Sequence, residues 1–268
     1  MMTIDSNHSN ASSLPHPEPP RGDRLELWHA QASSTDAGPT ERFCEQWLVE
    51  EEHASAARFR VAKARNQHVI GRGMARCLLS HRVCDARQIQ IETLEQGKPF
   101  VQSPEAAIRP FNIAHTDGLV MCGLASGARW IGVDVECLER RTDTNLARRY
   151  FASSEVAQLD RVRDEDERCH RFLKIWTLKE AFIKAIGTGL RTPLDAFWFE
   201  DSAADQPTIT FADSGLDQGR YWRFKSFEPR PGFIAAVAIG DVAEDLRQNV
   251  RLGIHAFEKW SQTRSVLD

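Results

Sequence analysis

W-I-G-V-D-V-E, at residues 130–136, is the stretch that decides the fold, because its pattern predicts a buried β-strand with an acidic face. Successive side chains of a strand point to opposite faces, so the three branched apolar residues share one face and can enter a core. Asp134 and Glu136 share the other face. The rise of a strand places their backbones about 7 Å apart, so both carboxylates can reach one cation.

The two carboxylates repel each other unless a cation or a proton lies between them. Ligands that are all oxygen favour Mg²⁺ or Mn²⁺ over Zn²⁺. Gly132 lies on the same face and is expected to keep it open for a bulky ligand. A strand with one acidic, solvated face explains the pair equally well, so the strand alone does not decide between the two interpretations.

Residues 165–186 are predicted to form a long helix that ends at Gly187. Trp176, Glu180 and Lys184 are spaced by four and therefore lie along one face of it. In the structural interpretation, the tryptophan is ordinary core and the other two form a surface ion pair. In the functional one, the tryptophan locks the helix, Glu180 faces the cation of the acidic strand and Lys184 faces a phosphate.

Two motifs together resemble a known enzyme family. G-V-D-V-E at 132–136 and W-T-L-K-E-A-F-I-K at 176–184, about 40 residues apart, resemble the two signature motifs of the Sfp-type 4′-phosphopantetheinyl transferases. G-K-P-F at 97–100 is similar to the family's G-K-P element, and F-N-I-A-H-T at 111–116 to its F-N-x-S-H-S element. The resemblance covers about residues 24–240.

The resemblance implies an α+β fold of two similar halves packed with a pseudo-two-fold relation. It implies Mg²⁺-dependent transfer of the 4′-phosphopantetheine group from coenzyme A to a serine of an apo acyl or peptidyl carrier protein, with 3′,5′-ADP as the other product; Mn²⁺ is the alternative metal. The serine proton is expected to pass to Glu180 or to a metal-bound water that it orients. The implied metal ligands are Asp134, Glu136 and Glu180, the catalytic residues are Asp134, Glu180 and Lys184, and the coenzyme A contacts are Lys63, Lys98, Pro99, Asn112, His115, Thr116, Asp134, Glu180 and Lys184.

The chain departs from the family pattern at two positions. Ala114 replaces a serine whose hydroxyl is expected to touch a phosphate, whereas Thr116 keeps a hydroxyl. Gln67 stands where many members carry an arginine, so Lys63 or Arg65 is expected to supply the basic contacts there.

The predicted organisation has four parts. They are a disordered, proline-rich tail at 1–22, a first α+β half at 23–128 that binds the nucleotide of coenzyme A, a second half at 129–245 with the metal and the catalysis, and a helical tail at 246–268. In the first half, helices are expected at 41–52 and 54–84, the second with Phe59 in its buried stripe.

Net charge, hydropathy and cysteine spacing limit the classes of protein to which the chain can belong. The 268 residues carry a net charge of −4, which argues against a surface that binds nucleic acid. Residues 54–87 hold eight basic side chains against Asp85, which fits a solvated face or an anchor for a phosphorylated nucleotide. With no apolar run near about 18 residues, no signal-peptide core and scattered cysteines, we expect a cytoplasmic protein with reduced thiols and no membrane span. The resemblance to a single-chain family of two halves implies a monomer. A degenerate homologue that only binds coenzyme A or a carrier protein remains the non-catalytic alternative.

Overall fold

A computed structural model describes residues 2–4, 24–126, 129–241 and 250–258. The helices are α1 (Pro39–Glu45), α2 (Glu50–Ala57), α3 (Ala62–Ser80), α4 (Ala147–Tyr150), α5 (Ser153–Asp160) and α6 (Glu165–Ile186). The strands are β1 (Met2–Ile4), β2 (Arg24–Gln31), β3 (Gln90–Thr93), β4 (Pro99–Ser103), β5 (Phe111–Thr116), β6 (Leu119–Leu124), β7 (Trp130–Cys137), β8 (Phe197–Glu200), β9 (Thr208–Phe211), β10 (Tyr221–Phe227), β11 (Phe233–Asp241) and β12 (Val250–Ala256). Among the described helices, none has the length and apolarity to cross a membrane.

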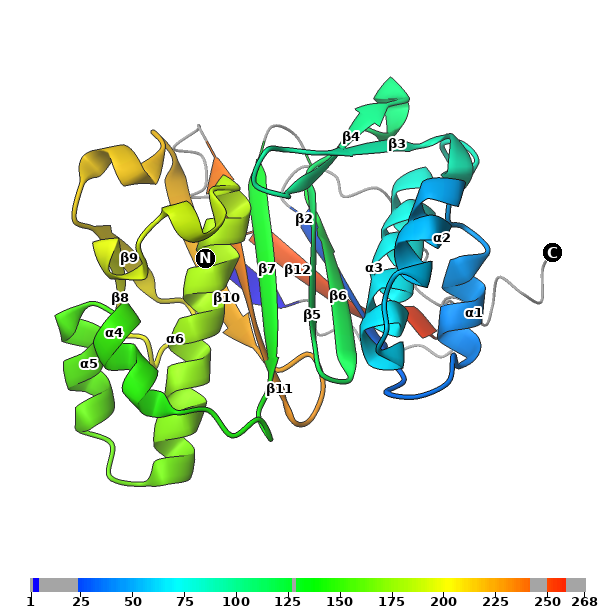
Figure 1. Ribbon diagram of the computed structural model, residues 1–268. Coiled ribbons are helices and arrows are strands. Elements are labelled where there is room, and N and C mark those ends of the chain that lie inside the picture. The colour runs from blue at the N-terminus through cyan, green and yellow to red at the C-terminus, as the bar shows by residue number, and fades with distance from the viewer. Residues whose placement is uncertain (1, 5–23, 127–128, 242–249, 259–268) are drawn as a thin grey trace.

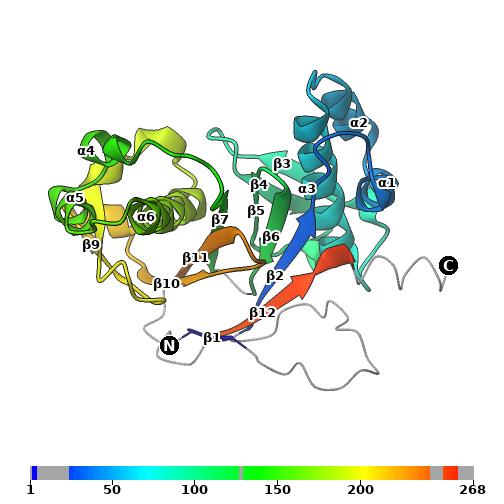
Figure 2. The ribbon, with the colours of Figure 1, turned by 90° about the horizontal axis from the view of Figure 1, so that it is seen from below.

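Two main sheets form the centre of the molecule. A five-stranded sheet has the order β1-β12-β2-β6-β5, and a three-stranded sheet has the order β10-β11-β7. Side chains from both sheets, among them Leu27, Met121, Val133 and Val237, share one buried cluster. α3 flanks the first sheet and α6 flanks the second, on opposite sides of the central strands (Figures 1 and 2). The fold is therefore α+β, as predicted.

Helix α6 lies directly on β7 because Gly132 has no side chain. A Cβ atom at Gly132 would lie 2.0 Å from the carbonyl oxygen of Ala181 and 2.4 Å from the backbone nitrogen of Ala185, so any larger residue would push the helix away. The prediction that this glycine keeps a face open for a ligand is wrong, since the helix backbone fills the space. The close approach brings α6 side chains next to those of β7.

Both ends of α6 follow from the sequence. Asp164 caps its start, where the side chain accepts a hydrogen bond of 2.9 Å from the backbone N–H of Glu167. Its end is Gly187, which adopts the left-handed conformation with φ of 72°. Trp176 packs against two buried clusters and stacks on Phe172. This arrangement fits both interpretations of the sequence, ordinary core and a lock on the rotation of α6.

The two sheets meet where β5 runs beside β7 (Figure 1). Two side chains of β5 hydrogen-bond to the backbone of β7 across this junction. Asn112 Oδ1 accepts from the N–H of Val133 at 2.8 Å, and Thr116 Oγ1 accepts from the N–H of Cys137 at 3.3 Å. These side chains satisfy backbone donors that would otherwise be buried without a partner.

Several predicted elements are wrong. The predicted helical tail is wrong for Val250–Ala256, which form strand β12. The predicted disordered tail is wrong for Met2–Ile4, which form β1. The predictions for residues 1, 5–22, 242–249 and 259–268 lie outside the described residues. The two helices expected at 41–52 and 54–84 are three, and Phe59 is 42% exposed between α2 and α3. Strand β4 was not predicted.

Candidate active site

An acidic cluster lies where α6 crosses β7. Asp134 projects from β7, and its Oδ1 accepts a hydrogen bond of 2.6 Å from Lys184 Nζ on α6. Lys184 therefore forms its ion pair with Asp134. It does not form the surface pair with Glu180 that helical spacing alone allows. Asp134 Oδ2 is buried and has no hydrogen-bond partner in the described part of the chain. A buried carboxylate oxygen without a partner is costly and points to a missing cation or proton.

Burial is the main cause of the shifted pKa values in this cluster. Burial raises the pKa of Asp134 to about 7, against the opposing effect of Lys184, and the charges of Glu180 and Glu136 raise it further. Burial also raises the pKa of Glu180. The pKa of His115 is lowered, by partial burial first and then by the charge of Lys184. The charge of Glu136 opposes this lowering, so His115 lies close enough to feel both Lys184 and Glu136, and its imidazole favours the neutral form.

Glu136 is held from both halves of the protein. Its Oε2 accepts a hydrogen bond of 3.1 Å from Thr116 Oγ1 at the end of β5. From the turn after β7, Arg140 Nη1 lies 3.1 Å from Oε1 and 3.1 Å from Oε2. Thr116, predicted as a coenzyme A contact, is thus tied to a predicted metal ligand.

A pocket of about 270 Å³ opens beside the acidic cluster. Its walls are the tip of the β3–β4 hairpin at 96–99, Asn112 and Ile113 of β5, and the last two turns of α6 with Glu180 and Lys184. The hairpin reaches across from the α3 side to the end of α6, above β7 (Figure 1). Both halves therefore contribute to one pocket.

Lys98 connects the hairpin tip to the second half. Its Nζ donates hydrogen bonds to the carbonyl oxygens of Ile131, at 3.2 Å, and of Ala185, at 2.5 Å. Burial lowers the pKa of Lys98 to about 8, and the charge of Arg220 acts in the same direction. Both Lys98 and Pro99 line the pocket, as the resemblance implies, but the ammonium group is engaged with backbone carbonyls.

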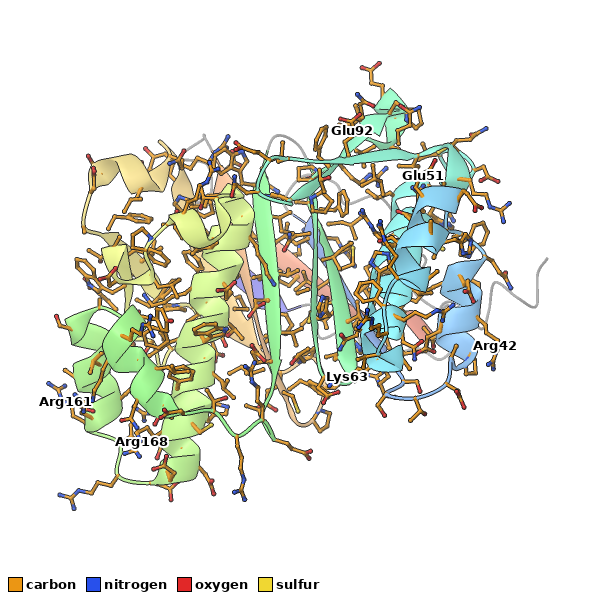
Figure 3. All side chains as sticks on the ribbon, viewed as in Figure 1. Arg42, Glu51, Lys63, Glu92, Arg161 and Arg168 are labelled. Atoms are coloured by element: carbon orange, nitrogen blue, oxygen red, sulfur yellow. The ribbon has the colours of Figure 1, made fainter. Side chains whose placement is uncertain are left out.

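Lys63 lies apart from this pocket. It is near the start of α3 (labelled in Figure 3) and pairs with Asp117 at 3.0 Å. Gln67, one turn further along α3, donates a hydrogen bond of 2.6 Å to the carbonyl oxygen of Thr116 and is buried. The structure thus groups Asp134, Glu136, Glu180, Lys184 and Thr116, while Lys63 does not line the pocket and is paired with the neighbour of Thr116.

A divalent metal ion fits the chemistry of these donors but not their present arrangement. In the described ranges, no three His, Cys, Asp or Glu side chains are placed to hold a metal ion. Lys184 and Arg140 contact the carboxylates of Asp134 and Glu136 instead. The partnerless Oδ2 of Asp134 and the oxygen-only donor set suit Mg²⁺ or Mn²⁺ once those cations shift.

Sequence reasoning missed two charged contacts near the site. Arg140 follows Glu136 by four residues in the E-R-R run after β7, and this spacing was the only signal for its contact. Lys179, the neighbour of Glu180, is fully buried and pairs with Glu155 of α5 at 2.8 Å. No local pattern reveals that partner, because 24 residues separate it from Lys179.

Comparisons with known proteins identify the family of the chain. A model described as 4′-phosphopantetheinyl transferase superfamily matches residues 131–238, and one described as 4′-phosphopantetheinyl transferase, N-terminal, matches residues 39–127. The 4′-phosphopantetheinyl transferase Sfp of Bacillus subtilis is 30% identical over 209 residues, which are 77% of this chain and 88% of that protein.

Two cyanobacterial proteins are similar over comparable lengths. The 4′-phosphopantetheinyl transferase HetI of Nostoc sp. is 28% identical over 83% of this chain and 92% of its own length. A putative 4′-phosphopantetheinyl transferase of Synechocystis sp. is 32% identical over 67% and 71%. The chain therefore belongs to the 4′-phosphopantetheinyl transferase superfamily and is a transferase of that type.

Proposed function

We propose that this protein transfers the 4′-phosphopantetheine group of coenzyme A to the serine hydroxyl of an apo acyl or peptidyl carrier protein, and releases 3′,5′-ADP. The observation that carries the proposal is the cluster of Asp134, Glu136, Glu180 and Lys184 beside a pocket that both halves line. The family of the chain supports the reaction type.

The reaction is attack of a hydroxyl on a pyrophosphate phosphorus, so negative charge develops on phosphate oxygens. Mg²⁺ held by Asp134, Glu136 and Glu180 would neutralise much of that charge. Lys184, at the edge of the pocket, supplies a further positive charge, and the neutral His115 can donate a hydrogen bond to a phosphate oxygen.

The serine proton needs an acceptor near the phosphorus. Glu180 lines the pocket, and burial raises its pKa, which makes its carboxylate a stronger base. In this proposal, Lys98, Pro99 and Asn112 lie along the pocket and contact the nucleotide portion. Lys63 would contact it only if the nucleotide extends to the start of α3.

The proposal includes three statements about the whole protein. The protein acts as a monomer in the cytoplasm. Its partners are coenzyme A and a carrier protein. Nucleic acid is not a partner. The net charge of −4 supports the last statement.

The direct test incubates the protein with coenzyme A, Mg²⁺ and an apo carrier protein and follows the mass of the carrier. Asp134→Ala and Glu180→Gln are each expected to lower the transfer rate by about 100-fold or more, the scale of losing one group that stabilises developing charge. A chelator should stop the reaction, and added Mg²⁺ should restore it.

Glu139→Gln is the matched control, because Glu139 is an exposed carboxylate on the turn three residues after Glu136. It should transfer at the wild-type rate, while circular dichroism shows that all three variants are folded. Full modification of the carrier by the Asp134→Ala variant would refute the assignment of the site. A wild-type protein that binds coenzyme A but never modifies a carrier would favour the non-catalytic alternative.

A further inference from the structure

The turn after β7 places a guanidinium group on one of the proposed metal ligands. Arg140 Nη1 contacts both carboxylate oxygens of Glu136 at 3.1 Å. Two backbone hydrogen bonds order the turn that brings Arg140 back toward Glu136. The N–H of Arg140 donates to the carbonyl of Cys137 at 3.2 Å, and the N–H of Leu138 donates to the carbonyl of Gly232 at 2.8 Å. The contact therefore results from an ordered turn.

The two partners differ in their freedom to move. Glu136 is buried at the junction of the sheets, where Thr116 also holds it. The Arg140 side chain is 59% exposed and can swing into solvent without breaking the turn. A cation that binds Glu136 needs the same carboxylate oxygens that Arg140 now contacts. Metal and guanidinium therefore compete, and the arginine is the one that can leave.

The net charge of the cluster depends on whether a divalent ion is bound and on whether Arg140 is present. Three carboxylates, Asp134, Glu136 and Glu180, face two cations, Lys184 and Arg140. A divalent ion would turn this formal deficit of one positive charge into an excess of one. A site with an excess of positive charge attracts an anionic pyrophosphate. Without Arg140, the metal-loaded cluster would be formally neutral.

We propose that Arg140 is a counter-ion for Glu136 while the metal is absent, gives way to Mg²⁺, and then remains at the edge of the site as a cation for the pyrophosphate. This inference rests on the proposed function of the site. Arg140 acts on the metal through Glu136, and on the pyrophosphate through its own charge. Its loss should have opposite effects on the two ligands: tighter binding of the metal alone and weaker binding of coenzyme A.

The test compares Arg140→Gln with Arg141→Gln, which removes the same charge from the next residue. Arg141 is exposed, and the described part of the chain shows no ion pair for it. Binding of Mn²⁺ to the full-length protein is measured by electron paramagnetic resonance of the free ion, without coenzyme A. Binding of coenzyme A is measured by calorimetry with saturating Mg²⁺.

Arg140→Gln is expected to bind Mn²⁺ about two- to five-fold more tightly and coenzyme A about two- to five-fold more weakly, the range for a partly exposed ion pair. Both differences should shrink at about 1 M salt. Arg140→Lys should lie near the wild type, and Arg141→Gln should change neither affinity.

Two results would overturn the inference. One is a Mn²⁺ affinity of Arg140→Gln equal to or below that of the wild type; the other is a parallel loss of both affinities, which a merely structural role of Arg140 predicts. Failure of the proposed function looks different, because the wild type itself would then bind no Mn²⁺ and its affinity for coenzyme A would not depend on Mg²⁺; the inference would fall with it.

Discussion

Asp134 shows how the burial of a single ionisable residue can lower the stability of the folded protein. It is buried beside Glu180 and Glu136, and Lys184 contacts only one of its two oxygens. Its pKa of about 7 means that the folded, metal-free protein prefers the protonated form more than the unfolded chain does. Ionising Asp134 therefore lowers the free energy of unfolding.

This pKa predicts a pH dependence of stability for the metal-free protein. The pKa of Asp134 is higher in the folded state than in the unfolded chain. Asp134 therefore contributes its full stabilisation to the folded state below about pH 4, and this stabilisation is lost as the pH rises through about 7. The free energy of unfolding should fall by a few kcal/mol, at about 1.4 kcal/mol for each pH unit between the unfolded-state and folded-state pKa values of Asp134. Urea unfolding in a chelator at a series of pH values measures it.

Asp134→Asn is the control, because the amide cannot ionise. Other groups with raised pKa values, such as Glu155 and Glu180, titrate in both proteins, so the difference between the two curves isolates Asp134. A difference that does not change with pH between 4 and 8 would contradict the burial of an ionisable Asp134.

Ala114 shows the limit of interpreting a motif position by analogy. Its side chain points into the buried cluster between the two sheets and away from solvent. Its neighbours on that face, Asn112 and Thr116, accept hydrogen bonds from the backbone of β7. By strand alternation, a serine at 114 would face the backbone of β7 near Val135. The serine that the family pattern expects would thus serve the junction of the sheets, and its replacement removes no side chain from the pocket.

At the scale of elements, one buried ion pair joins α6 to its surroundings. Lys179 Nζ lies 2.8 Å from Glu155 of α5 and donates to the carbonyl oxygens of Leu194 and Phe197 at 2.8 and 2.6 Å. Glu155 in turn accepts from the backbone N–H of Phe199 at 3.0 Å. The pair thereby fixes α5 and the segment leading into β8 against α6, one residue from the proposed catalytic Glu180.

Removing one partner of this pair should be costly. Lys179→Met leaves the carboxylate of Glu155 buried without a cation, so the free energy of unfolding should fall by about 3–5 kcal/mol. The double variant Lys179→Met/Glu155→Gln should recover part of that loss, because the buried group is then neutral. Urea denaturation of each variant measures both effects.

Arg171→Met is the control on the same helix. Arg171 pairs with Glu167 at the surface, so its loss should cost no more than about 1 kcal/mol. If Lys179→Met were no more destabilising than Arg171→Met, the two charges would not be a buried pair that orders α6.

The sequence was most informative where one pattern was long and uninterrupted. Strand β7 and helix α6 were predicted nearly to the residue, because alternation and a terminal Gly187 are local signals. Strand β12 was taken for a helix, because its role comes from parallel pairing with β2, more than 200 residues away. Spacing along β7 and α6 predicted that Asp134, Glu136 and Glu180 gather in one cluster. The ion pairs of Asp134 with Lys184 and of Glu136 with Arg140 are instead set by tertiary packing.

At the scale of the whole molecule, the two halves are tied together at several points. β12, near the C-terminal end of the chain, lies between β1 and β2 in the first sheet. Met2 exchanges two hydrogen bonds with Gln206, through its N–H at 2.8 Å and its carbonyl at 2.9 Å. Arg230 of the β10–β11 turn donates to His29 of β2 at 3.1 Å. With Lys98 at the hairpin tip, these contacts predict halves that keep a fixed relation around the pocket.

That fixed relation predicts where coenzyme A will protect the backbone. The pocket is lined by the hairpin tip at 96–99 and by Asn112 from the first half, and by Glu180, Lys184 and Gly187 from the second. Saturating coenzyme A with Mg²⁺ should therefore slow hydrogen exchange in both halves, since a ligand that contacts both walls must leave before either opens.

Hydrogen exchange followed by mass spectrometry separates the possible outcomes. The hairpin β8–β9 contributes no lining residue to this pocket and serves as the internal reference, with unchanged exchange expected. Lys184→Ala should reduce protection on both walls together, because Lys184 contacts Asp134 at the centre of the site. Protection confined to one half would mean that coenzyme A binds to one sheet alone, so the junction of β5 and β7 would hold the two halves together without forming the binding site.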